Sequence, residues 1–155
     1  MISKMRYVSV LAFIVSVSFA ASALAQTDTA MSNDDFGVQL TRPDGWDAAE
    51  GNDRAIFNIQ HEATQSQIEV IATELMSPDV ADVFYDTFHE TLEHSQFTQE
   101  ERAEATYGDH AGTLTRYRFE YAGVVLRVLV FQFTRESTAY LVVGYIKEDI
   151  FDAQS

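Results

Sequence analysis

The sequence contains no cysteine among its 155 residues. Disulfide bonds and thiol chemistry are therefore excluded, and stability has to come from packing alone. Only two prolines and seven glycines are present, which argues against a low-complexity or disordered chain. Positive charge is also scarce, because 24 Asp and Glu residues outnumber 10 Lys and Arg residues and give a formal net charge of −14. This charge opposes binding to nucleic acids and anionic membrane surfaces, and it favours basic partners.

The motifs of the common catalytic chemistries are absent as well. There is no GxSxG, no HExxH and no glycine-rich phosphate loop. Two pairs, His89 with Glu93 and Glu90 with His94, have the i,i+4 spacing that places both side chains on one side of a helix. His89 and His94 themselves diverge by roughly 140° around a helix axis. We therefore predict a solvated helix face here, with no metal site, no cofactor and no catalytic residues.

The most prominent feature that the sequence does contain is a long β-rich stretch from Thr113 to Ile146. β-branched and aromatic residues dominate it. It is interrupted only at Ala122-Gly123 and at Arg135-Glu136-Ser137-Thr138, and both interruptions are typical of turns. The stretch predicts three consecutive antiparallel strands, a C-terminal meander against which the rest of the chain packs.

The N-terminus has the layout of a cleavable signal peptide. Lys4 and Arg6 form a short positive segment, an apolar run with scattered serines covers residues 7–20, and Ala23-Leu24-Ala25 supplies the small residues of a cleavage site. We predict that residues 1–25 are removed on secretion to the periplasm. No cysteine follows the cleavage site, so we expect no lipid anchor and no stable membrane anchor in the mature protein.

Two regions remain after cleavage. Residues 26–35 are small and polar and predict a flexible N-terminal arm, and residues 36–155 predict a single domain. Loss of the leader removes Lys4 and Arg6 and no acid, so the net charge falls from −14 to −16.

The first half of the domain predicts three strands. Apolar and polar residues alternate over Phe36–Thr41, and Pro43-Asp44-Gly45 then forms a turn in which proline presets φ and glycine accepts a positive value. Trp46 follows and is expected to cover the edge of the core. Ala55–His61 and Gln67–Met76 predict a hairpin.

A helix is predicted to begin at Ser77-Pro78-Asp79, where serine caps, proline takes the first turn and an acid follows. It should run for about five turns. Its predicted buried stripe consists of Val80, Phe84, Phe88 and Leu92. A short strand at Ala103–Tyr107 then precedes the meander. The order of elements predicts an α+β fold, an antiparallel β-sheet with one long amphipathic helix packed on a face.

Three arginines of the meander form the candidate functional site. If the Ala122-Gly123 turn is symmetric, Arg118 lies opposite Arg127, and Arg116 lies on the same face. Like charges directly opposite each other destabilise a sheet. Acids such as Glu120 could neutralise them, or the face could meet an anionic ligand or a protein partner. The predicted core-facing row on the other side is Tyr117, Phe119 and Tyr121.

The Pro43–Trp46 corner, the hairpin, the Ser-Pro helix start and the terminal meander together resemble the PsbP/DcrB-like superfamily, over residues 36–146. The resemblance implies an α-β-α sandwich and mostly non-enzymatic accessory and assembly roles. Such proteins carry a C-terminal helix after the last strand. Either residues 148–155 form one short helical turn, or the sequence is a C-terminally truncated fragment, and an absent helix would leave part of one sheet face uncovered.

Three functional hypotheses follow. The first is a periplasmic, non-enzymatic binding or accessory protein with a partner in the cell envelope. The second is a chaperone-like adaptor or immunity-type protein that acts through an exposed sheet face. The third is an enzyme whose site is assembled from distant residues, with His61, His110 and surface acids as candidates.

Overall fold

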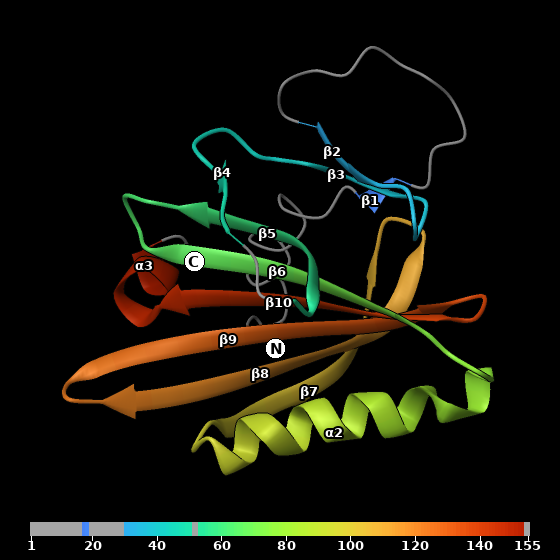
Figure 1. Ribbon diagram of the computed structural model, residues 1–155. Helices are drawn as coiled ribbons and strands as arrows, with labels where there is room; N and C mark the ends of the chain where they lie inside the picture. Colours follow the sequence, from blue (N-terminus) through green and yellow to red (C-terminus); the bar gives the residue numbers. More distant parts are fainter. Residues whose placement is uncertain (1–16, 19–29, 51–52, 154–155) are drawn as a thin grey trace.

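The structure is a computed structural model that describes residues 17–18, 30–50 and 53–153 (Figure 1). It combines a large antiparallel sheet, a small sheet and one long helix, which is the predicted α+β class. The elements in chain order are β1 (Val17–Ser18), β2 (Ala30–Asn33), β3 (Val38–Thr41), β4 (Asp47–Ala48), β5 (Ala55–His61), β6 (Ser66–Glu74), the 3₁₀ turn η1 (Pro78–Val80), α2 (Ala81–His94), β7 (Thr98–Tyr107), β8 (His110–Tyr121), β9 (Val124–Arg135), β10 (Thr138–Lys147) and α3 (Glu148–Ala153).

The large sheet has seven strands in the order β4-β5-β6-β10-β9-β8-β7. β8, β9 and β10 are consecutive antiparallel neighbours, so the predicted meander is confirmed. Ala122 and Gly123 join β8 to β9 with φ values of 50° and 78°. Positive φ at both residues of a two-residue loop is typical of the type I′ turn, whose twist matches that of paired strands.

Strand β7 forms one edge of the large sheet and is longer than predicted. The sequence indicates a strand only at Ala103–Tyr107, whereas β7 begins at Thr98. Its first half is exposed and reads Thr-Gln-Glu-Glu-Arg, so it lacks the alternation of a half-buried strand. Charged side chains on an exposed edge also discourage pairing with a second sheet.

An N-terminal hairpin lies where a flexible arm is predicted. Ala30–Asn33 form β2, which pairs with β3, so the prediction of a flexible arm is wrong for these residues. β1 lies inside the predicted signal peptide and pairs with the other side of β3. The rest of the leader, including the predicted cleavage site after Ala25, lies outside the described residues. Local composition missed β2 because strand formation depends on the partner strand.

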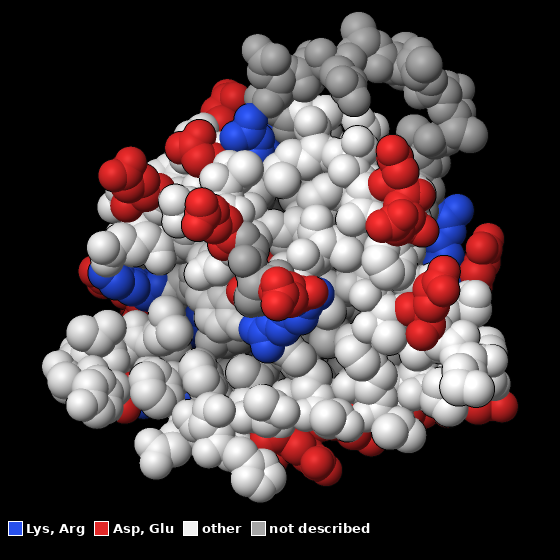
Figure 2. Space-filling model, viewed as in Figure 1, with Lys and Arg blue, Asp and Glu red and all other residues white. Residues whose placement is uncertain are grey.

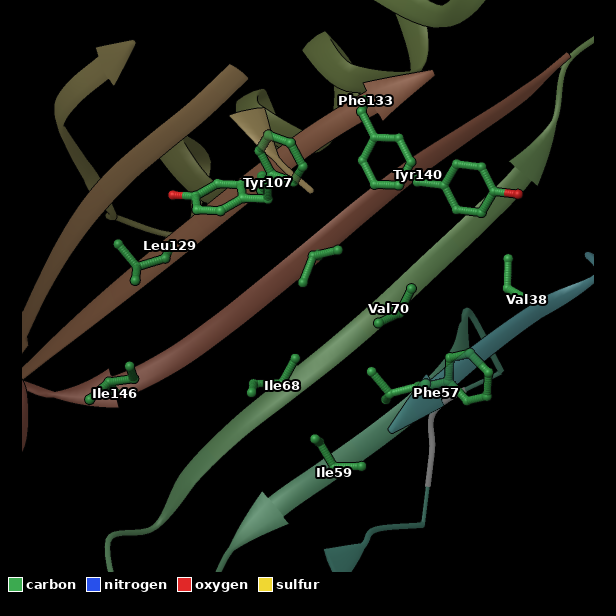
Figure 3. Close-up of a cluster of buried hydrophobic side chains, with 13 residues drawn as sticks. Val38, Phe57, Ile59, Ile68, Val70, Tyr107, Leu129, Phe133, Tyr140 and Ile146 are labelled. Atoms are coloured by element: carbon green, nitrogen blue, oxygen red, sulfur yellow. The ribbon is translucent and has the colours of Figure 1, made fainter. Parts of the chain in front are cut away.

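The first hydrophobic core lies between this hairpin and one face of the large sheet (Figure 3). Val38 and Leu40 of β3 are buried in it. Aromatic rings stack along β9 and β10, with the Phe133 and Tyr140 centroids 4.9 Å apart. Ile150 of α3 packs against the same cluster. The hairpin therefore covers much of the face that a short C-terminal helix is expected to leave open.

Helix α2 covers the opposite face of the sheet, and its buried side is rotated from the predicted one. Its buried residues are Ala81, Tyr85, His89 and Leu92. Leu92 is buried as predicted, but Phe84 and Phe88 are only half-buried and Val80 is exposed. Tyrosine and histidine count as polar in a sequence pattern, yet both bury their rings when the polar atoms find partners.

Candidate functional site

We define the arginine face as Arg116, Arg118 and Arg127, which share one face of β8 and β9. The strand register places Arg118 directly opposite Arg127, and Arg116 lies two residues away on the same side. Tyr117 and Val128 point to the other face, where they are fully buried in the core beneath α2. The predicted register is therefore confirmed. It could be predicted because it depends only on the local turn.

Glutamates neutralise every arginine of this face. The ion pairs are Arg116–Glu101, Arg118–Glu120 at 2.7 Å, Arg127–Glu100, and Arg127–Glu148 at 2.5 Å. Glu148 also lies 3.9 Å from Arg118 Nε, so one carboxylate at the start of α3 bridges the two arginines that oppose each other. These pairs offset the repulsion across the strands and tie β7 and α3 to the meander.

The other face of β8 carries the aromatic row Tyr117, Phe119 and Tyr121. Only Tyr117 is fully buried. Tyr117 has no exposed surface, while Phe119 is half-buried and stacks on Phe97 with ring centroids 4.8 Å apart. Tyr121 is 74% exposed, so the prediction that it faces the core is wrong. The reason is tertiary: α2 ends at His94, and the connection after it covers β8 only as far as Phe119.

The tip of the β8–β9 hairpin exposes apolar side chains. Tyr121 pairs directly with Val124 across the turn, and Val124 is 53% exposed. A depression beside Val124 is lined by Gly123, Val124, Val125, Lys147, Glu148 and Asp149. The hairpin projects past the ends of β10 and α3 in Figure 1, and its tip, at the lower left, is uncharged in the view of Figure 2. We call Tyr121, Val124 and this depression the tip surface.

A buried polar network joins α2 to the large sheet. His89 Nδ1 lies 2.6 Å from Tyr117 Oη, and His89 Nε2 lies 2.6 Å from Gln132 Oε1. Because an amide oxygen only accepts, Nε2 carries the hydrogen and Nδ1 accepts from the Tyr117 hydroxyl. Burial lowers the pKa of His89 and raises the pKa of Tyr117 to about 12, so both groups are neutral at pH 7. The prediction of a solvated helix face is therefore wrong at His89.

Lowering the pH from roughly 7 to 5 is expected to destabilise the protein through His89. Burial is the main cause of its lowered pKa, and Arg102 of β7 adds to it, while the bond to Gln132 and the charges of Asp86 and Glu93 oppose it. Between its lowered folded pKa and the ordinary value of 6.5, the unfolded chain binds more protons. The stabilisation is therefore complete above 6.5 and is lost as the pH falls below it.

Urea unfolding at a series of pH values, for the wild type and for His89→Gln, checks this expectation. Glutamine keeps polar atoms near Tyr117 but does not titrate. The wild type should lose more free energy of unfolding than the variant over the same pH interval. Parallel curves would show that other groups cause the acid sensitivity.

A second buried polar cluster, on β5 and β6, was not predicted. Glu69 is buried, and its Oε2 accepts a hydrogen bond from Arg54 Nη2 at 2.9 Å. Gln67 Nε2 lies 2.9 Å from Asn58 Oδ1 and 3.3 Å from Glu69 Oε1. Burial lowers the pKa of Arg54, but the bond to Glu69 and its charge outweigh this, so the pKa is raised. The Arg54 guanidinium also lies 5.9 Å from the Phe88 ring centroid, which links the residue just before β5 to α2.

The two histidines of the enzyme hypothesis lie apart. His61 Nδ1 is 3.0 Å from Thr64 Oγ1, and its ring meets Trp46 edge-on at 5.7 Å between centroids. Trp46 packs at the edge of the first core, as predicted. The His110 ring stacks on Phe133 at 4.6 Å. Three strands separate β5 from β8, a distance of about 19 Å. The fold therefore does not bring His61 and His110 together.

The described part of the chain contains neither a metal-binding cluster nor a membrane-spanning helix. Over residues 17–18, 30–50 and 53–153, no group of three or more His, Asp or Glu side chains is arranged to hold a metal ion. Within the same ranges, none of the helices has the length and apolar character needed to cross a membrane.

Solved structures show what the fold is similar to. CyanoP, the cyanobacterial PsbP from Synechocystis sp. PCC 6803, is 15% identical with a TM-score of 0.62, over 86% of this chain and 89% of that one. LpqN of Mycobacterium tuberculosis, a protein involved in cell envelope biogenesis, is 15% identical with a TM-score of 0.52, over 72% of each chain. A protein from Bacteroides thetaiotaomicron VPI-5482 is 10% identical with a TM-score of 0.54, over 75% of this chain and 41% of that one.

The chain therefore has a PsbP-like α+β fold, as its resemblance to the PsbP/DcrB-like superfamily implies. At these identities the likeness concerns the fold. No protein-family model matches the sequence, and comparison with curated protein sequences found no similar protein.

Proposed function

We propose that this protein is a secreted, non-enzymatic binding or accessory protein of the periplasm. It contacts a protein partner in the cell envelope through the tip surface and the adjacent arginine face. The predicted signal peptide supports secretion. LpqN, which shares the fold, is involved in cell envelope biogenesis, and this supports the compartment.

The exposure of Tyr121 is the observation that carries the proposal. A tyrosine with three quarters of its surface in solvent, paired with an exposed valine on a projecting hairpin, is the kind of anchor that dominates protein interfaces. Arg118 and Glu120 project from the opposite face of the same strand with partly exposed side chains, so a partner that wraps around the hairpin tip would meet them as a charged rim. The depression next to Val124 offers a partner side chain a place to insert.

The contacts of the histidines support a non-enzymatic role. His89 is neutral and held on both ring nitrogens by Tyr117 and Gln132. His61 supports the turn at Thr64, and His110 packs on an aromatic ring. A catalytic base needs a ring nitrogen within reach of a substrate, and in His89 both nitrogens are occupied in the core.

Photo-crosslinking in living cells tests the proposed interface. A photoreactive benzoylphenylalanine at position 121 should crosslink to an envelope protein, because the Tyr121 side chain is 74% exposed. The same group at Asp109, in the exposed turn at the other end of β8, is the matched control. Adducts would be found as shifted bands and identified by mass spectrometry.

A second variant tests the charged rim. Arg118→Gln removes the pairs with Glu120 and Glu148 and should lower the yield of the adduct from position 121. The result that would overturn the proposal is the same adduct pattern, in the same yield, from positions 121 and 109.

A further inference from the structure

The outer face of α2 carries an uncharged ridge that no described part of the chain covers. We define the outer ridge as Val80, Val83, Thr87 and Thr91, which recur at intervals of three and four residues. All four residues are exposed, and Val83 is 66% exposed at the middle of the outer face. A valine exposed to this extent gains little free energy from folding, and most of its side chain is available for a partner.

The threonines of this ridge are less polar than their sequence implies. Thr87 Oγ1 donates to the Val83 carbonyl at 2.7 Å, and Thr91 Oγ1 donates to the Thr87 carbonyl at 2.8 Å. These hydroxyls are satisfied within the helix. The methyl groups are then the part of each side chain that remains for contact. The ridge therefore offers an apolar seam about three turns long.

Acids line one flank of the ridge, and none of them forms an ion pair within the described part of the chain. We define the acid row as Asp82, Asp86, Glu90 and Glu93, all exposed. α2 contains no Lys or Arg, and none of the ion pairs among the described residues includes a member of the acid row. Like charges at i,i+4, such as Asp82 with Asp86, destabilise a helix. Acidic side chains are also seen along the lower edge of Figure 2, where α2 lies in Figure 1.

We propose that the outer face of α2 docks a cationic amphipathic helix of a partner protein. Apolar side chains of that helix would pack along the outer ridge at the spacing of a helix–helix seam, and its Lys and Arg residues would face the acid row. Charge selects this occupant over a second copy of the chain, because a symmetric pairing would place acid row against acid row. This surface is distinct from the tip surface, because the outer ridge lies along η1 and α2, whereas Tyr121 and Val124 lie at the β8–β9 turn.

Peptide binding tests the proposal with a defined probe. The probe is a synthetic three-heptad helix with leucine at the seam positions and lysine at the flanking positions, and the control peptide carries glutamate in place of lysine. Fluorescence anisotropy at low salt should detect binding of the lysine peptide and none of the glutamate peptide. Asp86→Asn should weaken binding, whereas Asp109→Asn, with the same charge change in a distant turn, should not.

Val83→Asp separates docking on the ridge from simple attraction of a polycation. It removes the central apolar side chain and adds a negative charge, so attraction by charge alone would bind the peptide as tightly or more tightly. Docking on the outer ridge predicts binding weaker by about tenfold. Unweakened binding to Val83→Asp would overturn the proposal. So would a dimer of the protein alone, seen by analytical ultracentrifugation and dissolved by Val83→Asp, because the ridge would then be a self-association surface.

Discussion

Gly112→Ala is expected to destabilise the protein by at least the roughly 1–3 kcal/mol that is typical of overpacking. A methyl group at this position of β8 would overlap the Gln132 carbonyl oxygen of β9, and it would approach Phe131 Cε2 to 3.0 Å. A backbone oxygen in a paired strand cannot move aside as a flexible side chain can. The methyl group therefore forces β8 and β9 apart beside the first core.

Gly144→Ala is the matched control for this prediction. Gly144 lies in β10 of the same sheet, and a Cβ there meets nothing within 4 Å. The free energy of unfolding of the Gly144→Ala variant should stay the same or rise by up to about 1 kcal/mol, because alanine loses less conformational freedom on folding than glycine. Urea unfolding of both variants checks the pair, and similar losses in the two would contradict the geometric argument.

Tyr85→Ala is expected to lower the free energy of unfolding by about 3–5 kcal/mol. Tyr85 is only 4% exposed and packs in the core between α2 and the sheet. Its hydroxyl donates to the Phe133 carbonyl at 2.5 Å and lies 2.9 Å from Thr134 Oγ1. The substitution therefore removes a buried ring and leaves a buried carbonyl without its partner.

Milder substitutions on α2 show how much of this loss of stability comes from the Tyr85 ring and how much from its hydroxyl group. Tyr85→Phe keeps the ring and should cost about 1–3 kcal/mol, the penalty for an unsatisfied buried group. Phe88→Ala, which the apolar stripe predicts to cost about 3–5 kcal/mol, should cost less than Tyr85→Ala because Phe88 is only half-buried. Val83→Ala should change stability by no more than about 0.5 kcal/mol. If Phe88→Ala proved more costly than Tyr85→Ala, the assignment of the buried face would be wrong.

The meander was predictable because its determinants are local. β-branched and aromatic residues specify the strands, and the Ala122-Gly123 turn specifies which residues face each other. The opposition of Arg118 and Arg127 follows from that turn alone. The start of the helix was predictable for the same reason, since Ser77 caps through its own side chain, whose Oγ accepts from the Asp79 amide.

Elements that are specified by a partner segment rather than by their own residues were missed. The first half of β7 is exposed and highly charged, and it is a strand only because β8 lies beside it. Ala30–Asn33 likewise become β2 through pairing with β3. The buried side of α2 was misplaced because Tyr85 and His89 are buried by partners on β8 and β9, between 28 and 49 residues away.

The candidate site also combines features that the sequence determined with features that only the tertiary structure determined. The sequence by itself determined that three arginines share one face of the meander, because side-chain alternation and a two-residue turn leave one register. Only the tertiary structure decided that Glu100, Glu101 and Glu148 neutralise Arg116 and Arg127, since these acids lie 15 to 27 residues away on β7 and α3. It also decided that Tyr121 is exposed, because burial depends on where the covering helix ends. A hairpin register is set within one turn, whereas the neighbours of a side chain depend on how distant segments pack.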